Sequence, residues 1–171
     1  MTSVRVSTAT HSVTHVTTNL LWGLRRIIRD CGLDQTKITN QWETLEAGTS
    51  AWLTSGHLRA LVLEVYDPRR STGSDLIGRF DFTIDYGYYP DGDGDLWLDP
   101  DTVAFAIRRA GTYPSACDYR FVADTAPGYP RVDGWGDTTF RSTTGMARHT
   151  LGTGIGGGSL GASLSYYRRT S

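Results

Sequence analysis

Residues 57–68 read HLRALVLEVYDP, and this stretch decides how the rest of the chain must fold. Apolar side chains occupy both phases of its two-residue alternation, which is typical of a strand covered on both faces. Asp67-Pro68 then ends the run, because proline cannot donate a hydrogen bond to a sheet ladder. A strand of this kind needs other strands beside it and further elements packed against it.

A second strand is predicted after the turn-rich segment 69–75. From Ile77 to Tyr86, aromatic and aliphatic residues in one phase alternate with arginine, aspartate and threonine in the other. The pattern predicts one buried and one polar face, and a hairpin with the preceding strand. Cys117 to Thr125 alternates in the same way and predicts one more strand.

Two helices are predicted before the strands. Between Ser12 and Cys31, apolar residues recur at three- and four-residue steps, and Gly32 supplies a stop signal. Asp34 or Thr36 can cap a second helix that ends before Gly56. The tryptophans inside these helical patterns are predicted to be core residues: Trp22, Trp42 and Trp52.

A third helix, capped by Asp99 or Asp101, is predicted to end at Gly111. The predicted order is therefore helix, helix, strand, strand, helix, strand. The remainder, Pro127 to Ser171, is rich in Gly, Ser, Thr and Arg and has few large apolar residues. Because such a segment cannot form a core alone, we expect it to wrap over the domain, with a flexible glycine run at 152–161.

Length and charge narrow the functional classes. The 171 residues fit one domain, and the net charge of −1 lacks the basic footprint expected of a protein that binds nucleic acid directly. No run approaches the roughly 20 apolar residues of a membrane span, and the N-terminus has no signal-peptide core, which predicts a cytoplasmic protein without a membrane partner. Cys31 and Cys117 form no metal or redox motif and are expected to be small buried residues.

Two motifs resemble catalytic signatures but lack their context. Residues 152–157 match G-x-G-x-x-G without the strand, helix and acidic residue of a dinucleotide site. Residues 157–161 match G-x-S-x-G around Ser159, yet no histidine follows that serine, and His149 precedes it. A small hydrolase that uses Ser159 and His149 therefore remains the alternative function.

The candidate metal sites in the sequence also lack part of their ligand sets. Asp91, Asp93 and Asp95 resemble the start of a calcium loop, but the glycine and glutamate that such a loop needs are missing, so a hydrated turn is favoured over a weak ion site. His11 and His15 are four residues apart without a third ligand, which favours solvent-facing or capping roles. The sequence predicts no catalytic residue, no metal and no cofactor.

Ten short stretches, in the same order along nearly the whole chain, resemble the bacterial HORMA-domain proteins of CBASS anti-phage systems. They are THSVTHVT (10–17), GLD (32–34), LEVYDP (63–68), RFDFTIDYG (79–87), DGDG (91–94), AIRRAG (106–111), PGYP (127–130), GW (134–135), RSTTGM (141–146) and LGT (151–153). The resemblance implies an α+β fold in which three helices pack on a small antiparallel sheet. It further implies that residues 1–126 form the HORMA core and residues 127–171 a C-terminal safety belt of the same domain.

The resemblance also implies a function, which is that of an adaptor and not of an enzyme. In this family the belt closes around a peptide, the closure motif, that adds as a strand to a sheet edge. The closed form binds and activates a cGAS/DncV-like nucleotidyltransferase, and an AAA+ ATPase reopens the domain from its N-terminus. A second HORMA protein is left open as a further partner.

The resemblance places the peptide on two parts of this sequence. The edge strand would contribute Tyr119, Phe121 and Ala123, and the belt would contribute Trp135, Arg141 and Met146. The remodelling ATPase would engage the N-terminal residues Thr2, Ser3, Val4 and Arg5.

Overall fold

The computed structural model describes residues 2–88 and 96–170, and the description of side chains in the first helix begins at His11. Three helices and six strands make up the described chain. In chain order they are α1 (Thr2–Asp30), α2 (Thr36–Ser55), β1 (Leu58–Tyr66), β2 (Leu76–Asp85), β3 (Trp97–Leu98), α3 (Pro100–Ala110), β4 (Asp118–Thr125), β5 (Met146–Gly157) and β6 (Leu160–Arg169).

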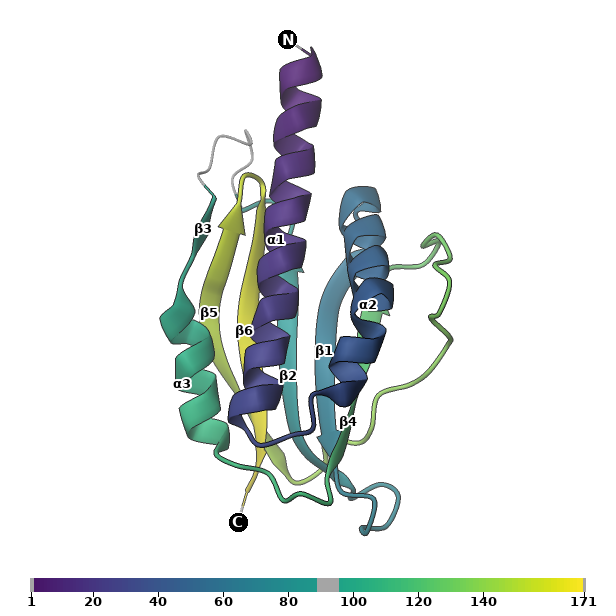
Figure 1. Cartoon of the computed structure of the whole chain (residues 1–171), viewed down its shortest axis with the longest axis vertical. Helices are drawn as coiled ribbons and strands as arrows, with labels where there is room; N and C mark the ends of the chain where they lie inside the picture. The colour runs from purple at the N-terminus through teal and green to yellow at the C-terminus, as the bar shows by residue number, and fades with distance from the viewer. Residues whose placement is uncertain (1, 89–95, 171) are drawn as a thin grey trace.

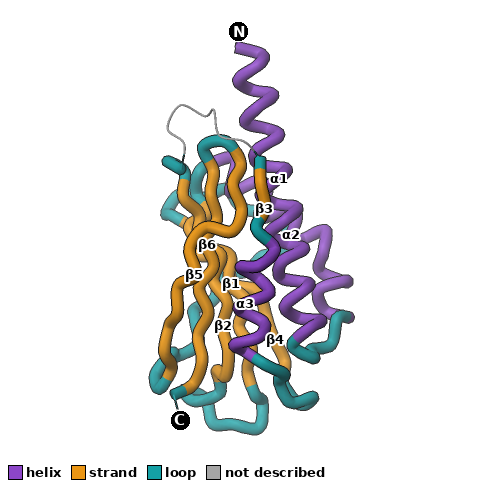
Figure 2. The backbone as a smooth tube through the Cα atoms, turned by 90° about the vertical axis from the view of Figure 1, so that its left-hand side faces the viewer, coloured by secondary structure: helices purple, strands orange, loops and turns teal. Residues whose placement is uncertain are grey.

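The strands form one antiparallel sheet in the order β3-β5-β6-β2-β1-β4. Figure 1 shows this order from left to right, and Figure 2 shows all three helices on one face of the sheet. Strand β1 lies inside the sheet, between β2 and β4. The predicted central strand and its hairpin with β2 are confirmed, as is the predicted α+β fold with three helices on an antiparallel sheet.

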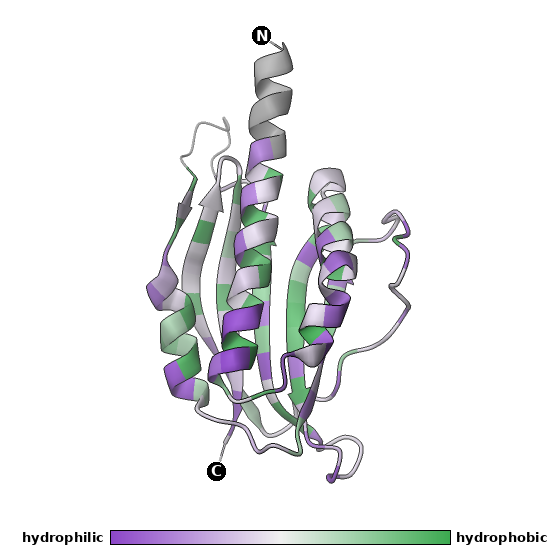
Figure 3. Cartoon of the chain, in the orientation of Figure 1, coloured by the Kyte–Doolittle hydropathy of each residue, from purple (hydrophilic) through white to green (hydrophobic). Residues whose placement is uncertain are grey.

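The core lies between the helices and the helix-facing side of the sheet. Apolar residues of α1 at three- and four-residue steps are fully buried: Val16, Leu20, Leu24, Ile27 and Ile28. They belong to one cluster with the helix-facing residues of the two central strands, Leu61, Leu63, Phe80 and Phe82. Figure 3 shows the same layer as the hydrophobic stripe along β1, β2 and the inner sides of the helices. Each such side chain contributes roughly 1.5 to 3 kcal/mol through its burial.

The predicted cap of α3 is confirmed, whereas the N-cap position of α2 is Gln35, which makes no side-chain cap bond, and Asp34 lies one residue before it. The Asp34 carboxylate accepts a hydrogen bond from the backbone N–H of Thr36 at 2.8 Å, and that bond holds the pKa of Asp34 below its usual value. Asp99 accepts from the backbone N–H of Asp101 at 2.9 Å at the start of α3. These contacts satisfy helix N–H groups that have no partner inside the helix.

The first helix differs from the prediction in two ways. It begins at Thr2 and not at Ser12, because its first turns extend past the end of the sheet (Figure 1) and have no core to impose an apolar pattern. Trp22, predicted to be core, is 52% exposed on the outer side of α1, so that prediction is wrong. Its ring packs edge-on against Trp42 at 5.5 Å, and the Arg25 guanidinium lies over both rings.

The glycine-rich tail is not the flexible run that the sequence suggested. Residues 146–169 form the hairpin of β5 and β6, and β6 pairs with β2 from Gly78 to Asp85. Glycines here let neighbouring elements approach closely: a Cβ on Gly157 would lie 3.0 Å from Val16 of α1, and one on Gly154 would lie 3.1 Å from Thr102 of α3. A Cβ on Gly156 would overlap the indole of Trp97. The expectation of flexibility is therefore wrong, because lack of side chains permits close packing as well as freedom.

The structure also bears on the histidine and aspartate motifs noted in the sequence. His15 is bonded to the Trp97 carbonyl oxygen at 3.0 Å and joins α1 to β3. Asp91, Asp93 and Asp95 lie outside the described residues. Within 2–88 and 96–170, no group of three or more potential metal ligands gathers. None of the described helices combines the length and the apolar character needed to cross a bilayer.

The two thiols should differ in reactivity. Cys31 is fully buried, and burial raises the pKa of its thiol to about 11; Cys117 is only partly buried, and burial raises the pKa of its thiol as well. Since the thiolate is the reacting form, about one Cys31 in a thousand is ionised at pH 8. We expect a disulfide reagent to label Cys117 at least tenfold faster in the native protein, and both thiols equally in denaturant. Equal native rates would contradict the burial of Cys31.

Candidate functional site

Between β4 and β5 the chain crosses from the edge strand β4 to the far side of the sheet, where β5 lies next to the other edge. We call residues 126–145 the crossing segment. It starts where the Ala126 N–H donates to the His57 carbonyl at 2.8 Å, and it is the long irregular connection beside α2 at the right of Figure 1. Two anchors, on opposite faces of the sheet, hold this segment in place.

The first anchor joins the crossing segment to α2 through two tryptophans. The Trp135 indole N–H donates to the Thr44 carbonyl at 2.9 Å, and the Trp52 indole N–H donates to the Pro130 carbonyl at 2.7 Å. The two rings meet edge-to-face, with centroids 5.0 Å apart. Each indole thereby buries its ring and satisfies its only polar atom, which is the arrangement that buried tryptophans favour.

Two glycines make this anchor possible. Gly48 lies in the middle of α2, where glycine costs about 1 kcal/mol relative to alanine. A Cβ there would overlap the Trp135 indole. Gly134 has a φ of +89°, and a Cβ on it would lie 2.7 Å from Thr44. The indole therefore reaches the helix backbone only because both positions lack a side chain.

The second anchor is a buried carboxylate on the face of the sheet opposite the helices. Glu64 of β1 is fully buried and accepts a hydrogen bond from Arg120 Nε of β4 at 2.6 Å. From the crossing segment it accepts the Arg141 backbone N–H at 2.8 Å and the Arg141 guanidinium at 3.3 Å. That guanidinium also lies 3.7 Å above the Tyr66 ring and pairs with Asp75. A buried charge is stable only when it is paired and hydrogen-bonded in this way.

Between the two anchors lies the outer edge of β4. The Tyr119 N–H bonds to the side chain of Asp118, and its carbonyl accepts from Lys37 Nζ at 2.7 Å, so both groups point away from β1. In an antiparallel pair this direction alternates with every residue. The N–H and C=O groups of Phe121 and Ala123 therefore also point outward, whereas those of Val122 point toward β1. No strand among the described residues pairs with this edge.

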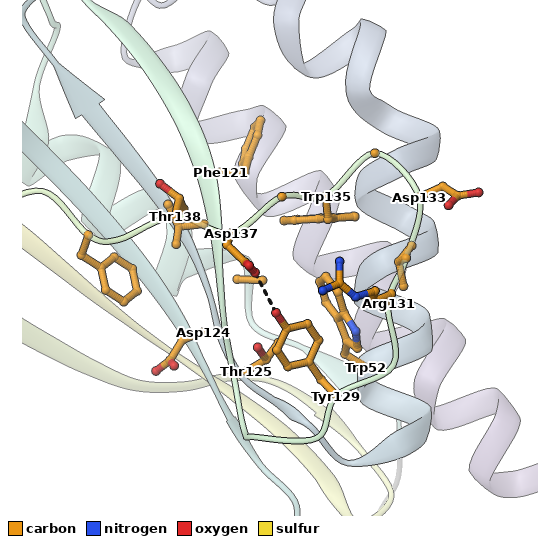
Figure 4. Close-up of a pocket in the computed structure, with 16 residues that line it drawn as sticks. Trp52, Phe121, Asp124, Thr125, Tyr129, Arg131, Asp133, Trp135, Asp137 and Thr138 are labelled. Carbon is orange, nitrogen blue, oxygen red and sulfur yellow. Dashed lines mark hydrogen bonds between the residues drawn. The ribbon is translucent and has the colours of Figure 1, made fainter.

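A cleft of about 420 Å³ separates this edge from the crossing segment. Figure 4 shows how the side chains of β4, α2 and the crossing segment surround it. One wall is aromatic, formed by Trp52, Phe121, Tyr129 and Trp135. Three carboxylates, Asp124, Asp133 and Asp137, and one guanidinium, Arg131, also line it. The Tyr129 hydroxyl donates to Asp137 at 3.0 Å, and that carboxylate raises the pKa of the phenol.

The structure brings together three of the six residues predicted to contact a peptide. Phe121, Ala123 and Trp135 line the cleft. Tyr119 is not part of the lining, and its buried side chain donates from its hydroxyl to the Asp34 carbonyl oxygen of the α1–α2 turn. Arg141 pairs with Glu64 on the face of the sheet opposite the helices. That these residues contact a peptide stays a prediction.

The other predicted positions lie away from the cleft. Met146 begins β5 and pairs with Arg169 at the far side of the sheet. The backbone of Thr2, Ser3, Val4 and Arg5 forms the first turns of α1, and their side chains are outside the described part of the chain. Their engagement by a remodelling ATPase stays a prediction.

The alternative hydrolase dyad is not assembled. His149 lies in β5 and stacks on Tyr166 with ring centroids 4.9 Å apart. Ser159 lies in the turn between β5 and β6, beyond Gly157 at the end of β5. At about 3.3 Å per residue of strand, roughly 25 Å separates the two, far beyond hydrogen-bond reach.

Comparisons with known proteins agree on one family. The model of bacterial HORMA domain 2 matches residues 1–170. The chain belongs to this bacterial HORMA-domain family. A search of curated proteins gives no match.

Solved structures share the fold at low sequence identity. A chain of the mitotic checkpoint complex aligns with a TM-score of 0.69 at 9% identity, over 95% of this chain and 97% of that chain. HTP-2 of C. elegans, bound to an HTP-3 closure motif, gives 0.56 at 17% identity, over 81% and 70%. The structure of the E. coli MS115-1 CdnC:HORMA-deltaN complex gives 0.58 at 16% identity, over 95% and 90%. These similarities support the HORMA fold.

Gly48→Ala tests the first anchor of this HORMA domain. The added methyl group must displace the Trp135 ring, so we expect a loss of about 1 kcal/mol of unfolding free energy despite better helix propensity. In a Trp135→Ala background the same substitution should instead stabilise by up to about 1 kcal/mol. Urea denaturation of the four proteins measures this coupling, and additive effects would show that Trp135 does not contact α2 in solution.

Glu64→Ala tests the second anchor. Removing the carboxylate leaves Arg120 and Arg141 without their shared partner, so we expect a loss of about 3 kcal/mol. The matched control is Asp124→Asn, which breaks an ion pair with Arg59 at 3.1 Å that is largely exposed and should cost less than about 1 kcal/mol. Equal losses in the two variants would mean that Glu64 is not buried in solution.

Proposed function

We propose that this protein is a peptide-binding conformational switch that acts in the cytoplasm. Closed around a closure-motif peptide, it binds and activates a cGAS/DncV-like nucleotidyltransferase in anti-phage defence. The observation that carries the proposal is the unpaired outer edge of β4, which faces the crossing segment across a cleft. An extended peptide placed there adds a strand to the sheet, and its main chain supplies affinity without a fixed sequence.

The dimensions of the cleft support a short peptide. Its volume lies within the range of roughly 300 to 1,000 Å³ typical of ligand sites. At the Tyr119 end of this edge, the Lys37 ammonium already donates a hydrogen bond to the Tyr119 carbonyl and pairs with Asp118 at 2.7 Å. The other end of the edge is occupied in the same way, because the Thr125 carbonyl accepts a hydrogen bond from Arg59 at 3.0 Å. The edge open to a new strand therefore runs from Phe121 to Asp124. Four residues of strand at about 3.4 Å each span about 14 Å.

The two anchors support a switch and not a permanently open groove. The crossing segment passes outside the cleft and is fixed on α2 at Trp135 and behind the sheet at Arg141. A peptide lying in the cleft is thus enclosed on its outer side. For a peptide to enter, the crossing segment must be released from at least one anchor. The bound peptide then stabilises the closed arrangement over the open one.

The E. coli neighbour supports the choice of partner. That structure contains a HORMA protein in a complex with CdnC, and its HORMA chain has the fold found here. The C. elegans neighbour is bound to a closure motif. On this proposal an AAA+ ATPase ends the signal by pulling on the start of α1, whose first turns extend beyond the sheet (Figure 1).

Ala123→Pro separates peptide binding from folding. Proline removes the outward N–H of β4, which is not part of the β1–β4 ladder, and proline is tolerated on edge strands for that reason. We expect an unchanged circular dichroism spectrum, and at least a tenfold weaker complex with the nucleotidyltransferase of the same operon in gel filtration. Synthesis of the cyclic oligonucleotide should fall to the same extent.

Ala123→Gly is the matched control, because it changes the same side chain and keeps the N–H. It should bind and activate like the unaltered protein. The proposal fails if Ala123→Pro activates fully, or if the unaltered protein neither binds nor activates the nucleotidyltransferase.

A further inference from the structure

The cleft offers different chemistry on its two sides, because β4 turns alternate side chains to opposite faces of the sheet. Phe121 and Ala123 face the helices and pack at the margin of the main core. Val122 faces the other way and forms a separate small cluster with Ala60 and Val62. Asp124 shares the phase of Val122. A strand paired with β4 presents its own side chains to the same two faces in alternation.

The helix-facing side is a rigid apolar wall. The indole N–H groups of Trp52 and Trp135 are both bonded to backbone carbonyls, which fixes the planes of the two rings. Tyr129 meets Trp52 edge-on with ring centroids 5.9 Å apart. Such a wall takes an aliphatic or aromatic side chain at little entropic cost, because its own rings are already held.

The other side is acidic where the crossing segment passes the sheet edge. Trp135 is bonded on the helix side, while Thr138 and Thr139 accept hydrogen bonds from Arg120 on the opposite face. Asp137 therefore lies at the passage itself, as Figure 4 shows, near the end of β4 that carries Asp124. Asp124 has Arg59 as a counterion, but Asp137 is bonded only to the neutral Tyr129 hydroxyl and has no ion-pair partner in the described chain.

One cation, Arg131, also lines the cleft. Figure 4 shows its guanidinium beside Trp52, and its charge opposes the rise in the pKa of the Tyr129 phenol that Asp137 causes. Three carboxylates face this single guanidinium in the lining, so the cleft keeps an excess of negative charge. In a narrow cleft with apolar walls, such a charge raises the local concentration of cationic groups and favours a cationic side chain on the incoming strand.

We propose that the cleft selects a basic amphipathic peptide, with apolar side chains toward Trp52 and Trp135 alternating with lysine or arginine toward Asp124 and Asp137. The proposal rests on the proposed function, since it specifies which peptide the closure site takes. Asp137 is its main specificity-determining residue, and the aromatic wall sets the register.

A displayed library of random heptapeptides tests it. The full-length protein is used as bait at 50 mM salt, and selected peptides are synthesised and measured by fluorescence anisotropy. We expect lysine or arginine at alternate positions and apolar residues between them. The double variant Asp124→Asn/Asp137→Asn should bind these peptides roughly tenfold more weakly, and the difference should shrink at 500 mM salt because exposed charges are screened.

The outcomes separate the two proposals. Asp101→Asn, which removes an exposed carboxylate on α3, is the matched control and should leave affinity unchanged. Selection of acidic or uncharged peptides, or equal loss in Asp101→Asn and the double variant, overturns the preference for a basic peptide and leaves the closure site standing. If no peptide is enriched over an empty support, or if Ala123→Pro binds the enriched peptides as well as the unaltered protein, the peptide site itself is wrong.

Discussion

The outer edge of β4 is the constraint around which the rest of this domain is arranged. Backbone N–H and C=O groups form a ladder only if a strand lies beside them, and an exposed edge invites pairing with any extended chain. The crossing segment encloses this edge without pairing with it, and so leaves a cleft of defined chemistry. The edge is thus shielded from unspecific pairing, and on our proposal it is available to one kind of strand.

An irregular segment stays over a sheet edge only if it is fixed at some points. The two anchors fix it through different kinds of interaction. Trp135 is held by van der Waals contact and one hydrogen bond, at a place where two glycines allow the approach. Arg141 is held by the Glu64 carboxylate, which lies where the interior strengthens electrostatic attraction. Because one anchor lies on each face, the segment must pass around the edge between them.

The sequence predicted the elements whose periodicity comes from the core. The two central strands and all three helices follow from apolar residues at two- or three-to-four-residue steps, and the ends of α2 and α3 from caps. The hairpin of β5 and β6 was missed, since glycines that exist for close packing against Val16, Thr102 and Trp97 look like a flexible loop. Trp22 was misplaced because periodicity cannot tell a core tryptophan from one that shields an arginine.

The sequence predicted those site residues that belong to a local pattern or to the family resemblance, and it missed those whose partners are distant in sequence. Phe121, Ala123 and Trp135 were chosen from the alternation of β4 and from resemblance, and they line the cleft. Glu64 was missed although it is the one charged residue between Leu61 and Tyr66, a signal that a buried partner must exist. Its partners, Arg120 and Arg141, are 56 and 77 residues away in sequence, so only the folded chain reveals them. Arg120 lies on β4 and not on the crossing segment, and it pairs with Glu64 at 2.6 Å, so the carboxylate keeps this partner if the segment leaves as proposed. A carboxylate with one permanent and one exchangeable arginine can therefore hold the segment closed without making its opening prohibitively costly.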